Sequence, residues 1–111
     1  MTQSRKEAIR KYKETKPDQG TFAIRCTSTG KVWVGAARNL YAARNGSWAA
    51  LRLGSHHEKS LQVDWNAHGE PAFEFSVLEK LEEDVQPLAV MDLLKEKKSH
   101  WVAELRAKPI L

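Results

Sequence analysis

Cysteine is the scarcest residue type in this chain of 111 residues, which holds Cys26 and no other cysteine. One thiol cannot form an internal disulfide and leaves no thiolate cluster for zinc, so both kinds of cross-link are excluded. Runs of about 18 apolar residues are absent too, which excludes a transmembrane helix. The charged first 16 residues lack the apolar stretch of a secretory signal. Together these absences predict a protein of the reducing cytoplasm with no membrane partner.

Acidic side chains are in the minority, since 14 Asp and Glu stand against 18 Lys and Arg for a net charge of +4. This excess is compatible with a nucleic-acid partner but too small to establish one, so DNA, RNA and protein all stay open as partners. Six of the cations lie within the first 16 residues, interleaved with Glu7 and Glu14. They predict either a solvated helix face or a surface that contacts phosphates.

What is present favours one folded domain, because hydrophobic residues make up 41% of the chain. Ser4 followed by Glu7 has capping-box spacing and predicts a helix to about Thr15. An Asn45-Gly46 pair predicts a kink in the helix around it. Alternation and capping signals place the other elements in chain order: strands over 21–28 and 31–37, helices over 40–53 and 55–69, a strand over 72–81, and a helix after Pro87.

This order predicts an α+β fold in which helices flank a three-stranded antiparallel sheet, with the elements running α-β-β-α-α-β-α. Residues 1–19 form an N-terminal basic helix and linker, and residues 20–111 form the domain. Residues of the last helix make one apolar stripe, which consists of Met91, Leu94, Trp101 and Leu105. Lys98 falls within that stripe, so it either extends its ammonium to solvent or faces a polar cleft.

Several stretches then resemble one enzyme family. GTFAI (20–24) followed by VWVG (32–35) resembles the two-strand signature of the GIY-YIG nuclease superfamily. Three later stretches are similar to the same family in the same order, especially to its homing-endonuclease members: GAARNL (35–40), GSHHEKSLQVDWNAHGEPAFEFSVLE (54–79) and LLKEKKSHWVAEL (93–105).

The resemblance implies hydrolysis of a phosphodiester with one divalent metal held by a glutamate, a tyrosine that helps activate water, and an arginine that steadies the phosphate. This chain departs from the family at every one of those positions. The family positions are Phe22 and Trp33 for the tyrosines, Ala43 for the arginine, Ser47 for a following His or Tyr, and Lys98 for the glutamate. A lysine cannot ligate Mg²⁺, so the resemblance implies a domain without the usual catalytic residues and without a cofactor.

Three functions therefore stay open. The first is an inactive nuclease domain that binds nucleic acid through a basic cleft of Arg25, Lys31, Arg38, Arg44, Arg52 and Lys98. The second is a protein-interaction or structural module on the same fold. The third is an active endonuclease that uses Mg²⁺ with the relocated residues Glu96 and Arg44. Trp33 either closes the former cleft or offers a stacking surface for a base.

Overall fold

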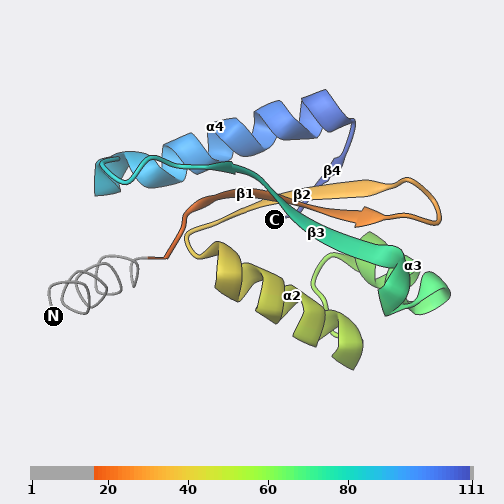
Figure 1. Ribbon diagram of the computed structural model, residues 1–111. Helices are drawn as coiled ribbons and strands as arrows, with labels where there is room; N and C mark the ends of the chain where they lie inside the picture. The colour runs from red at the N-terminus through yellow and green to blue at the C-terminus, as the bar shows by residue number, and fades with distance from the viewer. Residues whose placement is uncertain (1–16, 111) are drawn as a thin grey trace, which may run out of the picture.

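The computed structural model describes residues 17–110, so the helix predicted over 4–15 lies outside the described residues. A hairpin of β1 (Gly20–Cys26) and β2 (Val32–Ala37) forms the centre of the sheet. β3 (Phe73–Lys80) pairs antiparallel with the other edge of β1. The short β4 (Lys108–Pro109) pairs parallel with β2, which gives the order β3-β1-β2-β4 (Figure 1).

The predicted three-stranded antiparallel sheet is therefore wrong in strand number and in direction. The described chain runs β1, β2, α2, α3, η1, β3, α4, β4, so a strand and not a helix comes last. β4 has only two residues, one of them proline, and so carries no alternation that could reveal it. Its position depends on the edge of β2, where Ile110 N donates to Val34 O at 2.8 Å.

Two helices lie below the sheet in Figure 1, α2 (Leu40–Leu53) and α3 (Lys59–His68), with the short η1 (Glu70–Ala72) before β3. Asn39 caps α2 by accepting a hydrogen bond from Ala42 N at 2.9 Å. The predicted kink at Asn45-Gly46 is wrong, because α2 is continuous through Gly46. Burial of Trp48 and Leu51 anchors the second half of the helix and outweighs the cost of about 1 kcal/mol for an internal glycine.

The start of α3 also differs from its prediction. Ser55 and Glu58 form no capping box, because Ser55 Oγ donates to Ala50 O and Glu58 makes no side-chain cap. The carboxylate of Glu58 instead accepts from Ser60 Oγ at 2.7 Å. This end of the helix is tied to its surroundings by side-chain contacts rather than by a cap.

The helix α4 (Pro87–Leu105) covers the opposite face of the sheet (Figure 1). Val90 and Leu94 are its buried residues, while Met91 is 61% exposed and Leu105 is 37% exposed. The predicted stripe is thus correct at Leu94 and wrong at Met91 and Leu105. α4 contacts β2 and, to a lesser extent, β1.

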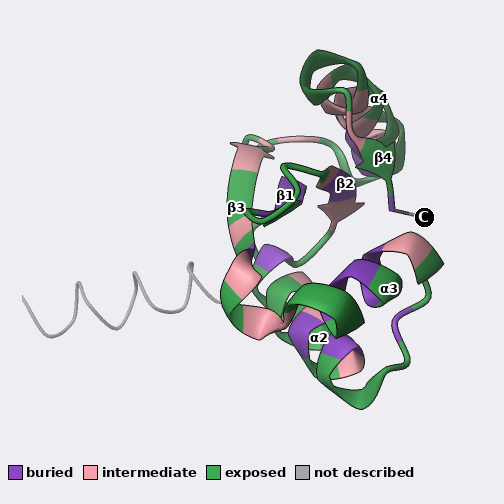
Figure 2. Ribbon diagram, turned by 90° about the vertical axis from the view of Figure 1, so that its right-hand side faces the viewer, coloured by how far each residue is buried: buried purple, intermediate pink, exposed green. Residues whose placement is uncertain are grey.

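The larger core lies between the sheet and the pair α2 and α3. Figure 2 shows buried segments on β1, β2, α2 and α3, whereas α4 is largely intermediate or exposed. The core cluster consists of Phe22, Ile24, Cys26, Trp33, Leu40, Trp48, Leu51, Leu61, Trp65, Phe73 and Ile110. Across the part of the chain that the structure describes, no helix is both long and apolar enough to cross a bilayer.

Candidate functional site

The first family position, Phe22, lies inside this core. Its side chain is 4% exposed and its ring stacks on Phe75 with centroids 4.9 Å apart. The same ring stands over Gly35, where a β-carbon would lie only 2.5 Å from Phe22 Cζ. Gly35 therefore gives the Phe22 ring its space, and that ring has neither a hydroxyl nor access to solvent.

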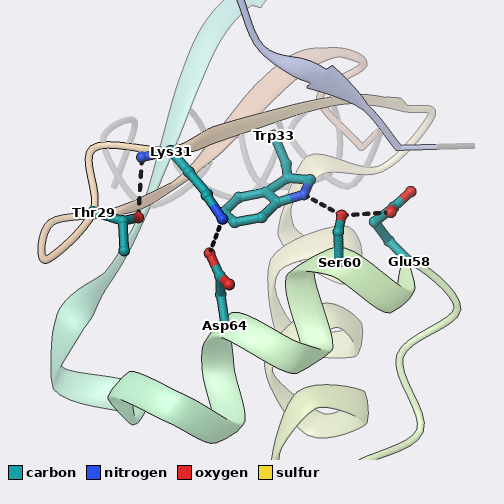
Figure 3. Close-up of polar contacts among 6 residues, drawn as sticks. All are labelled: Thr29, Lys31, Trp33, Glu58, Ser60 and Asp64. Atoms are coloured by element: carbon teal, nitrogen blue, oxygen red, sulfur yellow. Dashed lines mark hydrogen bonds and ion pairs between the residues drawn. The ribbon is translucent and has the colours of Figure 1, made fainter.

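The second family position, Trp33, pairs in register with Ile24 and is 1% exposed. Its indole Nε1 donates to Ser60 Oγ at 2.9 Å, and Ser60 in turn donates to Glu58 (Figure 3). A buried indole usually finds such a partner, so this contact satisfies the polar end of the ring. Trp33 closes the core and presents no open face on which a base could stack.

The same close-up shows a second link between the hairpin and α3 (Figure 3). Lys31 Nζ lies 3.5 Å from Asp64 Oδ2, and Lys31 N donates to Thr29 Oγ1 at 3.2 Å. That Asp64 oxygen is buried and accepts no hydrogen bond, so the ammonium of Lys31 is what compensates its charge. Lys31 is therefore part of a structural ion pair.

The α2 positions lie on the core side of the sheet with Phe22 and Trp33. Ala43 packs against the core cluster, and Ser47 is half-buried. Arg44 is exposed, and its guanidinium carbon lies 5.8 Å from the centroid of the Trp48 ring. The arginine that follows the family position is thus held over an aromatic ring at the helix surface.

The α4 positions lie on the other face. Lys98 Nζ donates to Ile110 O at 3.2 Å, so its ammonium meets a polar backbone group. Glu96 lines an open cavity of about 360 Å³ together with Glu79, Lys97 and His100. Glu96 lies on α4 and Arg44 lies on α2, and these two helices cover opposite faces of the sheet (Figure 1).

Glu79 holds most of the interactions in that cavity. Its carboxylate accepts from Lys97 and from Trp101 Nε1, the latter at 3.0 Å. The hydrogen bond from Lys97, followed by that from Trp101, keeps the pKa of Glu79 below its usual value. In residues 17–110 no three His, Cys, Asp or Glu side chains converge in a way that could hold a metal ion.

The six predicted nucleic-acid-binding cations do not form one cleft. Arg52 makes a bidentate ion pair with Glu70, with both hydrogen bonds at 2.7 Å, and Lys31 is paired with Asp64. Of these six side chains, those of Arg25, Arg38 and Arg44 make no ion pair and no hydrogen bond within the described chain. Arg25 lies opposite Val32 in the β1–β2 ladder, at the hairpin end of the sheet, whereas Arg38 follows the far end of β2.

A buried polar group that the sequence patterns did not reveal is His56, 3% exposed, in the connection before α3. Its backbone N donates to Gln62 Oε1 at 3.0 Å, and its Nδ1 accepts from Glu58 N at 3.0 Å. Burial, and then the neighbouring His57, lower the pKa of His56, while Glu58 opposes the shift. No pattern in the sequence indicated this contact, because it forms only when the connection packs against α3.

The hairpin, the two helices α2 and α3 on one face of the sheet and α4 on the other define an α+β domain, and comparisons identify its relatives. No family model matches the chain. Intron-associated endonuclease 1 of Enterobacteria phage T4 is 32% identical over 89 residues, which cover 80% of this chain. Those residues cover only 34% of the relative, so the chain spans about a third of that protein's length.

Solved structures also show similarity to an endonuclease. The catalytic domain of the homing endonuclease I-TevI superposes with a TM-score of 0.70 at 30% identity, over 84% of this chain and 98% of that domain. A mutant form of the same catalytic domain gives a TM-score of 0.68 at 30% identity, over 80% of this chain and 84% of the other. The chain therefore belongs to the GIY-YIG homing-endonuclease family of nuclease domains.

Proposed function

We propose that this chain is a nuclease-fold domain that does not cleave and that binds nucleic acid through its exposed arginines. The observation that carries the absence of cleavage is the packing of Phe22. A water-activating group must reach the reacting phosphate, whereas this ring is enclosed by Phe75 and Gly35 and has no oxygen. Trp33, at the second tyrosine position, is equally enclosed.

The family implies a divalent metal, and the residues present do not fit one. The glutamate position is Lys98, whose ammonium donates to a carbonyl and cannot ligate a hard cation. The relocated carboxylate of Glu96 lines a cavity with Glu79, Lys97 and His100, and no three His, Cys, Asp or Glu side chains of residues 17–110 are grouped so that they could hold a metal ion. We therefore derive no step that depends on a metal.

Support for the binding of nucleic acid comes from the exposed arginines and from the names of the related proteins. Both kinds of relative are named endonucleases, which makes DNA the first partner to test. Of the six predicted cations, Arg25, Arg38 and Arg44 make neither an ion pair nor a hydrogen bond within the described residues, so their guanidinium groups are available for phosphates. Binding of this kind is electrostatic, and its affinity falls with salt at a slope set by the number of phosphates contacted.

The test is a titration of the full chain against labelled DNA and RNA between about 20 and 150 mM salt, with cleavage of each probe followed in the presence of Mg²⁺ or Mn²⁺. We expect salt-dependent binding and intact probes. Affinity at low salt no better than that of a neutral control protein would refute the binding half. Metal-dependent cleavage would refute the other half.

A second candidate function is a protein-interaction module, favoured by the outer face of α4. Leu88 is 97% exposed there and Met91 is 61% exposed, which is costly for a helix face that meets only water. If this candidate is correct, a Leu88→Ser, Met91→Ser variant loses a protein partner that survives nuclease treatment. The same variant should leave any nucleic-acid affinity unchanged.

A further inference from the structure

The outer surface of α2 carries an inference that rests on the proposed function and specifies its ligand. Tyr41 is 77% exposed in the first turn of α2. Arg38 lies three residues before it and Arg44 three residues after it. Side chains three apart on a helix are neighbours on one face, so the Tyr41 ring and the Arg44 guanidinium share a surface.

We propose that Arg38, Tyr41 and Arg44, here called the α2 platform, bind single-stranded nucleic acid. The Tyr41 ring stacks on an unpaired base, and the two guanidinium groups contact the phosphates on either side. Stacking of this kind needs an aromatic face open to solvent. Among the Phe, Tyr and Trp side chains of residues 17–110, Tyr41 alone is exposed, and the others are buried or half-buried.

The charges around the α2 platform favour an anion. α2 contains no Asp or Glu, and its first turn has no acidic residue to offset the positive end of the helix dipole. Arg38 makes no ion pair or hydrogen bond within the described residues, and Arg44 is held over Trp48. The platform is therefore a cationic surface around an open aromatic ring.

Two carboxylates approach this region, and each already has a cation. Asp18, whose carbonyl accepts from Leu40 N, is paired with Lys80 at 3.1 Å. Glu70 lies close enough to interact with Arg44 but holds a bidentate pair with Arg52. Neither leaves an uncompensated negative charge beside the platform.

Single strands fit this surface better than a duplex does. A duplex hides the faces of its bases in the stack, and a base face is what Tyr41 can contact. Trp33, the aromatic that the sequence offered for stacking, is enclosed in the core. The phosphates of a duplex would engage the two arginines and gain nothing from the ring.

The experiment measures dissociation constants of the full chain for a labelled dT oligonucleotide of about 12 nucleotides and for the matching dA–dT duplex. The variants are Tyr41→Ala, Tyr41→Phe and Arg44→Ala. Two controls match them in chemistry and exposure. Leu53→Ala removes an 81% exposed apolar side chain from the same helix, and Lys95→Ala removes an exposed cation from α4.

We expect Tyr41→Ala to weaken binding of the single strand by about 5- to 100-fold, while Tyr41→Phe, which keeps the ring, stays within about twofold. Arg44→Ala should lower the slope of log affinity against log salt by about 0.7, and Lys95→Ala should not change it. All of these positions are on the surface, so melting temperatures should stay close to that of the parent chain.

The outcomes separate this inference from the proposed function. If the parent chain binds neither of these probes and does not bind the RNA of the titration above, the proposed function fails and the platform with it. If it binds but Tyr41→Ala and Arg44→Ala match the controls, the platform is wrong while the proposed function stands. A preference for the duplex with equal affinities for Tyr41→Ala and Tyr41→Phe would likewise refute single-strand stacking.

Discussion

Lys98 and Ile110 are joined by a hydrogen bond of 3.2 Å from the lysine ammonium to the isoleucine carbonyl. The side chain of Ile110 is 7% exposed and belongs to the same core cluster as Trp33. The residue at the family's glutamate position is thus linked, through the C-terminal segment, to the residue at its second tyrosine position. Both residues therefore contribute to the packing of residues 108–110.

Loss of that link should loosen the C-terminal segment. Lys98→Ala removes the donor and leaves the partly buried carbonyl of Ile110 without a partner, so we expect about 1–2 kcal/mol less free energy of unfolding. Urea titration measures it, with the exposed Lys95→Ala as control, expected within about 0.5 kcal/mol of the parent. Equal stabilities for the two variants would mean that the hydrogen bond contributes nothing.

Gly35→Ala tests the close packing over Phe22. The added methyl group would lie 2.5 Å from Phe22 Cζ, so the ring must move, at a cost of about 1–3 kcal/mol. The double variant with Phe22→Leu should be more stable than the sum of the two single effects implies, because the smaller side chain leaves room. Strict additivity in denaturant titrations would show that the two residues do not press on one another.

Gly46→Ala should stabilise the protein, whereas Gly35→Ala should destabilise it. Gly46 lies within continuous α2 with no atom within 4 Å of the position a β-carbon would take. Alanine is favoured over glycine in a helix interior by about 0.5–1 kcal/mol, so the melting temperature should rise. A fall would mean that α2 does bend at Asn45-Gly46, as the dipeptide by itself suggests.

Stability should fall as pH drops below about 6.5 because of His56. Its folded pKa lies below the unfolded value of 6.5, chiefly through burial, so the unfolded chain binds more protons in this range. The contribution is complete above pH 6.5 and is lost as pH falls. Glu70 and Glu79, with pKa values lowered by Arg52 and Lys97, contribute a separate loss below about pH 4.5.

His56→Asn separates these two ranges, since an asparagine oxygen can still accept from Glu58 N. Thermal melts of this variant should lack the loss that begins below about pH 6.5 and should keep the loss below about pH 4.5 that the parent chain shows. A variant that keeps the full loss near pH 6 would assign that loss to another group.

Much of the fold follows from local patterns. Alternation around Phe22 and Phe75 places β1 and β3 within two residues of their bounds, and Asn39 marks the start of α2. β4 could not be predicted, because Lys108 and Pro109 form a strand only by pairing with β2. The inner face of α4 was assigned wrongly at Met91, since apolar spacing alone does not reveal which side chains the sheet covers.

In the candidate site, too, some features could be predicted from local sequence patterns and others could not. Motif spacing identified the family positions Phe22, Trp33 and Lys98, because catalytic signatures depend on order along the chain. It could not show that Trp33 meets Ser60, 27 residues later, or that Lys98 meets Ile110, since such contacts exist only once the sheet and helices have packed. The sequence left open whether Trp33 closes the cleft or offers a stacking surface; its side chain is buried in the core, and the exposed ring is that of Tyr41.

The most direct test of the central claim is nicking of supercoiled plasmid by the full chain, at protein in excess over DNA, with Mg²⁺ or Mn²⁺. The account predicts no nicking above a buffer control, with identical results for the parent chain, Glu96→Ala and Arg44→Ala. Metal-dependent nicking by the parent chain that Glu96→Ala abolishes would contradict it.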